Sequence, residues 1–200
     1  MTRSSERSLL CLLLASLCAC EQVAKLDDLY IDENFAARDA GSDPHTALRE
    51  LCVATINKHR ASRELAPLER ASRQQEDCAD EGAETDRAMN MAHYSAQHRS
   101  ARCDEVGFGP ENACPDWRFG PGEEHASAAD ALVACIDRMW SQGAPPGELD
   151  ACKADLAEGG CYEQYGEWIN LTNTRAKYVS CGVSLDDDSL WVNQDFSVER

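Results

Sequence analysis

The chain is short of positive charge. Its 19 Lys and Arg residues stand against 36 Asp and Glu residues, so the formal net charge is −17 at neutral pH. Nucleic-acid binding depends on Lys and Arg to displace counterions from phosphates, so nucleic acid is excluded as an expected partner. The 200 residues also contain no Walker loop, no dinucleotide-binding glycine fingerprint and no Gly-x-Ser-x-Gly turn. Nucleotide-dependent and serine-hydrolase chemistry therefore lack their usual motifs.

Long hydrophobic runs are also missing. The N-terminal apolar run, residues 9–17, is too short to span a bilayer and follows Arg3 and Arg7, as in an export signal. It ends in Leu17-Cys18-Ala19-Cys20, which resembles the lipobox of bacterial lipoproteins. We predict a signal peptide over residues 1–19 and membrane attachment through acylated Cys20. An ordinary secretory signal with incidental cysteines is the alternative.

The expected location follows from the residues after Cys20. Glu21 replaces the aspartate that often retains lipoproteins at the inner membrane, which favours a bacterial outer membrane or cell surface. Residues 20–42 are polar and acidic and are expected to form a tether. Their few apolar residues could instead form a helix that packs on the domain of residues 43–200.

Cysteine is abundant, and its parity is informative. Without the signal cysteines and Cys20, eight remain: Cys52, Cys78, Cys103, Cys114, Cys135, Cys152, Cys161 and Cys181. In an oxidising compartment an even set predicts four disulfides, with 105 possible pairings. Short-range closure of Cys103 with Cys114, and of Cys152 with Cys161, is the simplest expectation. Metal ligation by these thiols is the rival interpretation, but the chain has no Cys-x-x-Cys pair.

Helical periodicity predicts three principal helices. The first opens at Asp43-Pro44 and ends near Ser62, and the second runs over residues 71–92. The third starts from a Ser127 cap with Asp130 three residues later. The second helix has an expected inner face of small or soft groups: Cys78, Ala79, Ala83, Met89 and Ala92.

The remaining segments are predicted as loops and one hairpin. Glycine and proline mark residues 103–126 as a loop and residues 141–164 as an irregular insertion. Apolar residues alternate over 179–185 and again over 190–196, which predicts two paired strands. Three aspartates, 186–188, form the turn between them. Calcium binding there is the alternative, although the spacing does not match an EF-hand loop.

Several motifs in this order are shared with a known family. They are Asn57-Lys58-His59-Arg60 with Leu65-Ala66-Pro67-Leu68, then His93, Glu111-Asn112, and Gly166-Glu167-Trp168-Ile169-Asn170-Leu171. Together they resemble the CAP superfamily, or SCP domain, of cysteine-rich secretory, antigen and pathogenesis-related proteins. The resemblance implies an α/β fold, a three-layer α/β/α sandwich, here cross-linked by disulfides. It also implies a cleft where typical members bring together two histidines and two glutamates.

This sequence departs from that set of four. His93 and Glu111 match, but Glu167 replaces the second histidine and Gly143 stands where the second glutamate is expected. If Glu167 enters the cleft beside Glu111, repulsion should raise the pKa of one carboxyl group. Such a set could hold a divalent cation, calcium or magnesium at least as well as zinc. Otherwise Glu167 points to water and His93 binds a loop.

Three functions remain open after these observations. The favoured one is a binding module with no resident cofactor, anchored in the cell envelope and recognising a lipid, envelope or protein ligand through residues 103–126 and 141–165. The second is a metal-dependent hydrolase that uses His93, Glu111 and Glu167. The third is a structural envelope protein. No nucleophile is paired with a positioned base in the sequence, so catalysis is not the leading hypothesis.

Overall fold

The computed structural model describes residues 44–198. The predicted signal peptide of residues 1–19, the acylation site Cys20 and the tether of residues 20–42 lie outside that range. Four strands form one sheet in the order β1-β3-β4-β2, where β1 pairs parallel to β3 and the other pairs are antiparallel. They are β1 (Glu69–Arg70), β2 (Glu111–Arg118), β3 (Tyr178–Leu185) and β4 (Ser189–Ser197).

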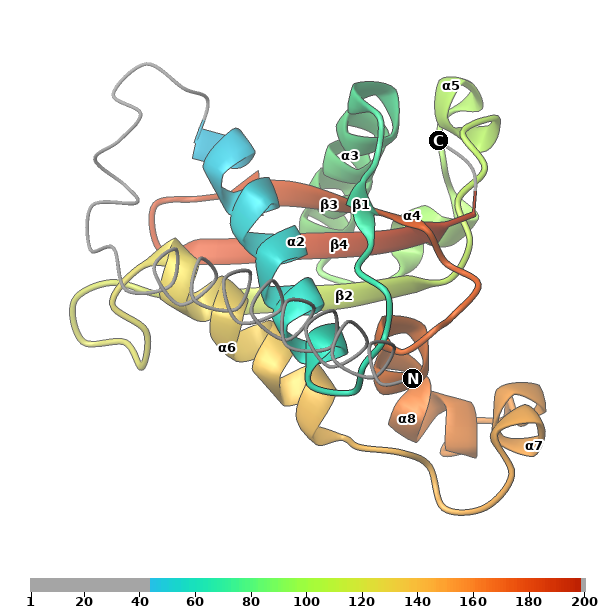
Figure 1. The fold of residues 1–200 in the computed structure, drawn as a ribbon. Coiled ribbons are helices and arrows are strands. Elements are labelled where there is room, and N and C mark those ends of the chain that lie inside the picture. The colour runs from blue at the N-terminus through green and yellow to red at the C-terminus, as the bar shows by residue number, and fades with distance from the viewer. Residues whose placement is uncertain (1–43, 199–200) are drawn as a thin grey trace, which may run out of the picture. The chain divides into compact units, whose positions relative to one another are not determined.

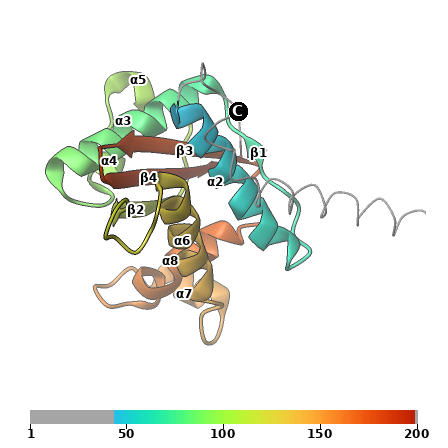
Figure 2. The same ribbon diagram turned by 90° about the vertical axis from the view of Figure 1, so that its left-hand side faces the viewer.

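Helices cover both faces of this sheet, as Figures 1 and 2 show. One face carries α2 (Pro44–Ala61) and α6 (Ala128–Ser141), and the other carries α3 (Arg73–Met89). The shorter helices are α4 (Tyr94–Gln97), α5 (Ala101–Asp104), α7 (Leu149–Ala154) and α8 (Cys161–Leu171). The predicted α/β class and three-layer arrangement are confirmed. Within residues 44–198, no helix combines the length and apolar character needed to cross a bilayer.

The main hydrophobic core lies between the sheet and the α2–α6 layer. Its members include Cys52, Ile56, Leu132, Ile136, Met139, Val179, Val183, Leu190, Val192 and Phe196. These residues recur at helical spacing in α2 and α6 and at every second position in β3 and β4. The periodicity of the sequence therefore predicted which side of each element is buried.

The opposite interface, between α3 and the sheet, is built from small and polar groups. Ala79 and Ala83 are buried, and α3 approaches β3 so closely that a Cβ at Gly182 would lie 2.0 Å from the Ala79 carbonyl. The Asp80 carboxylate accepts a hydrogen bond from Val183 N at 2.7 Å. Met89 does not belong to this inner face, as was expected, because its side chain is 50% exposed at the end of α3.

A buried arginine joins three segments at one end of the core. Arg60 is 1% exposed and donates to the backbone carbonyls of Ala66 and Leu171 at 2.9 and 2.7 Å. Leu171 is the last residue of α8, where helix carbonyls lack intrahelical partners and carry partial negative charge. Burial lowers the pKa of Arg60. Because the guanidinium of Arg60 is buried away from water, the backbone carbonyls supply the hydrogen bonds that it needs.

All eight predicted cysteines form disulfides. The pairs are Cys52–Cys181, Cys78–Cys103, Cys114–Cys135 and Cys152–Cys161. The short closure of Cys152 with Cys161 is confirmed, but the closure of Cys103 with Cys114 is wrong. Cys103 faces α3, whereas Cys114 lies in β2 on the face covered by α6, so each pairs with the layer that it contacts.

Three further expectations need correction. Residues 103–126 are not a continuous loop, because β2 lies within them and pairs with β4. The second helix ends at Met89 rather than near residue 92, since Asn90 adopts a left-handed conformation that terminates it. The insertion at 141–164 contains α7 and the first turn of α8. The aspartate turn is confirmed, and Arg87 binds Asp186 at 2.6 Å.

Candidate functional site

The site begins where α3 ends, at a turn organised by Asp86. This carboxylate is completely buried and accepts hydrogen bonds from the backbone amides of His93 and Ser95 at 3.0 and 2.6 Å. The Asn193 side chain of β4 donates to it at 3.0 Å. His93 is held with φ 63°, a conformation that L side chains rarely adopt. The buried hydrogen bonds of Asp86 maintain this strained turn and fix His93.

His93 pairs with Glu111, as the resemblance implied. His93 Nδ1 lies 2.8 Å from Glu111 Oε1, with 48% of the histidine side chain exposed but only 5% of the glutamate side chain. The hydrogen bond to Glu111 raises the pKa of His93, against the opposing effect of burial. The pair is therefore a half-exposed imidazole oriented by a buried carboxylate.

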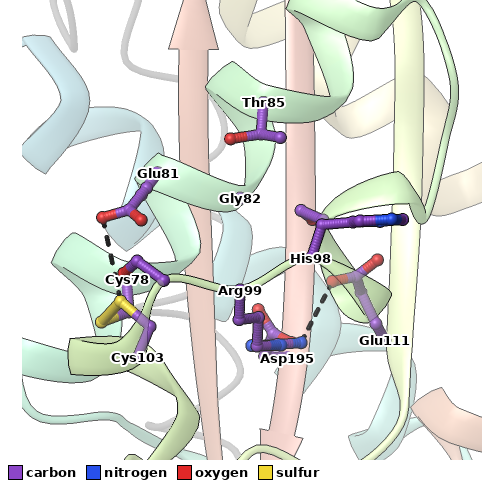
Figure 3. A pocket seen from close by; sticks show the side chains of 11 residues that line it. Cys78, Glu81, Gly82, Thr85, His98, Arg99, Cys103, Glu111 and Asp195 are labelled. Atoms are coloured by element: carbon purple, nitrogen blue, oxygen red, sulfur yellow. Dashed lines mark hydrogen bonds and ion pairs between the residues drawn. A yellow bond between two sulfur atoms is a disulfide. The ribbon is translucent and has the colours of Figure 1, made fainter.

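Arg99 occupies the other side of Glu111. Its guanidinium lies 3.4 Å from Glu111 Oε2 and 2.7 Å from the carboxylate of Asp195 in β4, and it packs over the ring of Phe108 at 4.2 Å. Figure 3 shows Arg99 beside Asp195 with the contact to Glu111 marked. Burial and the charge of Glu111 together raise the pKa of Asp195 to about 7, although Arg99 opposes both effects. Glu111, Arg99 and Asp195, which come from three separate segments, thus form one network of ion pairs.

A small pocket lies next to Arg99 and extends toward α3. It is lined by Glu81, Gly82 and Thr85 on one side, by Arg99 and Asp195 on another, and by the Cys78–Cys103 disulfide (Figure 3). The space leaves room for about one water molecule. Pockets for drug-sized ligands are typically several hundred Å³, so this one suits water rather than a lipid.

Glu167 takes a different partner. Its carboxylate accepts a hydrogen bond from the side-chain amide of Gln142, whose oxygen accepts from Trp168 N at 3.2 Å. Burial raises the pKa of Glu167, while the charge of His93 lowers it. The residue is half-buried, so it does not simply point to water. Glu167 lies within electrostatic reach of His93, but its bonded partner comes from the end of α6.

An amide pair fixes the backbone beneath Glu111 and Glu167. Asn112 Nδ2 donates to the carbonyl of Glu167 at 3.1 Å, and Asn170 Nδ2 donates to Asn112 Oδ1 at 2.9 Å. Asn112 is completely buried and Asn170 is 4% exposed. These two asparagines, part of the motifs that carried the resemblance, join β2 to α8.

The observed donors do not fit the divalent-cation hypothesis. Zinc sites usually take three protein ligands rich in imidazole, and here one imidazole stands among carboxylates. Both oxygens of Glu111 already contact His93 and Arg99, and Glu167 is held by Gln142. Across residues 44–198, no group of three or more His, Cys, Asp or Glu side chains is arranged to hold a metal ion.

Sequence reasoning identified His93, Glu111 and Glu167, and it missed Arg99, Asp195 and Asp86. Alternation in the last strand placed Gln194 and Phe196 on the core face, so Asp195 had to lie on the other face. That was the available signal for Asp195. Nothing in the sequence indicated that Arg99, 96 positions earlier, would bind it.

Comparisons with known proteins rest on structure alone. No family model matches the sequence, and no curated protein matches it. Among solved structures, BmVAL-1 superposes with TM-score 0.52 at 16% identity, covering 81% of both chains. NaASP2, determined with Zn2+, gives TM-score 0.50 at 14% identity over 81% of this chain and 84% of that one.

A bacterial structure is also similar. An extracellular protein containing an SCP domain from Bacillus anthracis str. Ames matches at 18% identity and TM-score 0.45, over 81% of this chain and 45% of that one. These neighbours are members of the SCP/CAP family. At such identities the comparison concerns the fold. The described part of the chain therefore has the fold of the CAP superfamily, the SCP domain, which its motifs predicted.

Proposed function

We propose that the chain is an exported, lipid-anchored member of the CAP superfamily that acts as a protein-interaction module. The observation that carries this proposal is the pairing of the polar groups at the candidate site. Glu111 is engaged by His93 and Arg99, Asp195 by Arg99, and Glu167 by Gln142. An active site would instead hold a nucleophile and a base around an open position for a reacting atom. The four disulfides fit an exported protein.

The recognition surface is the α7 segment, defined as residues 142–165. Its Leu149 and Leu156 side chains are 41% and 73% exposed, and the Cys152–Cys161 disulfide holds the backbone beneath them. Beside it, Arg63 packs over the rings of Trp140 and Trp168, at 5.8 and 5.1 Å from the ring centres. Trp, Tyr and Arg are the residues enriched in protein interfaces.

The second expected recognition loop was residues 103–126. The part of it that follows β2, residues 119–126, is less suited. Its exposed side chains include Glu123 and Glu124, and none of the exposed large apolar residues lies there. The loop and the α7 segment flank the 14 residues of α6, which span about 20 Å. A small ligand therefore cannot touch both, and the apolar side chains favour the α7 segment.

Site-specific photo-crosslinking in the native envelope tests this proposal. We would place a photoreactive residue at position 156 and, as the matched control, at exposed position 123. A discrete protein adduct from 156, absent from 123 and lost in Leu149→Asp, is the expected result. Equal adducts from both positions, or none from 156, would refute the α7 segment as the recognition surface. Saturable binding of a labelled fatty acid or sterol without an adduct would replace the protein ligand with a lipid.

The anchor requires a separate measurement. We propose that Cys20 carries the lipid, on the basis of the motif that precedes it. Intact-mass spectrometry of the membrane-extracted protein should show an acylated N-terminal cysteine and a gain of eight protons on reduction of the four disulfides. A Cys20→Ser chain that stays in the membrane fraction would contradict lipid anchoring at that residue.

A further inference from the structure

Two methionines are exposed immediately before His93. The whole chain contains four methionines, and two of them occupy positions 89 and 91. Their side chains are 50% and 56% exposed, whereas Met139 is 1% exposed in the main core. Methionine is normally among the most buried residue types. The sequence Met89-Asn90-Met91-Ala92-His93 thus places two exposed thioethers and one half-exposed imidazole within five residues.

The backbone of this segment is a fixed turn. Asn90 has φ 49° and His93 has φ 63°, both left-handed. Asp86 fixes the turn twice, because its backbone carbonyl accepts from Met91 N at 3.0 Å and its carboxylate accepts from His93 N at 3.0 Å. The side chains of Met89, Met91 and His93 therefore all extend from one short turn whose backbone geometry is fixed. Methionine side chains are unbranched and have three rotatable bonds, so the two thioethers can adapt around a common centre.

Glu111 prepares the histidine for coordination. A metal-binding histidine usually donates its second N–H to a carboxylate, which fixes the tautomer and makes the other nitrogen a stronger ligand. His93 Nδ1 is 2.8 Å from the buried Glu111 carboxylate, which leaves Nε2 as the nitrogen for a metal. Arg99, which also pairs with Asp195, binds the other carboxylate oxygen of Glu111.

The donor set selects the ion. Thioethers are soft ligands that favour Cu(I), whereas calcium and magnesium require oxygen ligands. We propose that Met89 Sδ, Met91 Sδ and His93 Nε2 form a surface site for a soft monovalent cation, Cu(I) or its redox-inert analogue Ag(I). Two of its three donors, the thioethers of Met89 and Met91, are not among the cleft residues that the resemblance implies. It is independent of the protein-interaction function.

Competition titration tests the site in the full chain. Cu(I), kept reduced with ascorbate, is titrated against a chromogenic Cu(I) chelator, and Ag(I) is titrated by calorimetry. Every protein carries Cys11→Ser, Cys18→Ser and Cys20→Ser, because free thiolates would outcompete thioethers. The variants are Met89→Leu with Met91→Leu, which keeps volume at exposed positions, and His93→Ala. His125→Ala is the matched histidine control, and circular dichroism verifies folding of each variant.

The expected result is one equivalent of Cu(I) or Ag(I), with affinity at least about tenfold lower in the double methionine variant and in His93→Ala, and unchanged in His125→Ala. Equal affinity in the parent and the double methionine variant would overturn the proposal. So would Zn(II) binding with the same dependence on the two methionines, because the argument rests on soft donors.

Discussion

Gly182 marks a position where α3 contacts the sheet directly. A Cβ at this residue would lie 2.0 Å from both the carbonyl carbon and oxygen of Ala79 and 2.6 Å from the Asp80 amide nitrogen. All three neighbours are backbone atoms of a helix, so no side-chain rotation relieves the contact. Gly182→Ala therefore forces α3 away from β3.

The size of this displacement sets the expected loss of stability. Ordinary van der Waals contact begins at 3.4 Å, so α3 must withdraw by about 1.4 Å. Overpacking of this kind costs about 1–3 kcal/mol. The same movement breaks the 2.7 Å hydrogen bond from Val183 N to the Asp80 carboxylate, and a bond to a charged group is worth about 1.5–3 kcal/mol. We expect the free energy of unfolding to fall by about 2.5–6 kcal/mol.

Guanidinium denaturation followed by circular dichroism, with the disulfides intact, measures this loss. Ser180→Ala is the matched control, because Ser180 is completely buried on the same face and its hydroxyl has no hydrogen-bond partner among the described residues. It should change stability little. A Gly182→Ala protein within about 1 kcal/mol of the parent would refute the close contact and the magnitude derived from it.

Four other predictions concern the site and its scaffold. The Glu111 hydrogen bond raises the pKa of His93, so the stabilisation from this pair is complete below the ordinary value of 6.5 and is lost as pH rises through the raised value. An NMR titration should show the imidazole pKa falling in Glu111→Gln, and an unchanged value would contradict this cause. Arg99→Met leaves two buried carboxyl groups without their fixed cation and should destabilise by about 3–5 kcal/mol at neutral pH. Because burial and the charge of Glu111 raise the pKa of Asp195 to about 7, this carboxyl group is mostly neutral at pH 5, and denaturation at pH 5 should show a smaller loss. Replacing Cys52 and Cys181 with alanine opens a separation of 129 residues and should cost about 5 kcal/mol, against about 2.5 for Cys152 and Cys161, separated by 9. Equal costs in denaturation would reject the loop-entropy account. Asn112→Leu should cost about 1–3 kcal/mol because it removes the oxygen that accepts from the buried Asn170 amide and the amide that donates to the Glu167 carbonyl, and a double-mutant cycle should show coupling between Asn112 and Asn170.

Elements with regular apolar spacing were predictable from the sequence. α2, α6 and the β3–β4 hairpin bury one side against the same core, so each carries a clear period. β2 was hidden because Pro115 and Asp116 interrupt it. The pairing with β4 shifts between Cys114 and Trp117, and Asp116 has φ 47°, so the strand contains an irregularity that looks like a loop in sequence.

The site was predictable in its motif residues and not in its contacts. His93 and Glu111 follow from the family resemblance, and the structure pairs them. Arg99, Asp195 and Asp86 carry no local signature in the sequence. A charged residue that stays exposed and one that becomes part of a buried ion pair look the same until the fold brings the two partners together. Glu167 and Gln142 illustrate the same limit, since their bond depends on how the end of α6 meets α8.

Arg99 supplies the positive charge beside the two buried carboxylates of this site. Glu111 and Asp195 are 5% and 1% exposed in a chain that already carries excess negative charge, so burying both requires a nearby positive charge. A guanidinium stays protonated throughout the physiological range and presents several N–H donors in one plane. Its position over Phe108 removes it partly from water, which strengthens both ion pairs. Histidine at the same place would lose its charge near neutral pH. The permanent cation therefore helps to keep Glu111 as the carboxylate that orients His93.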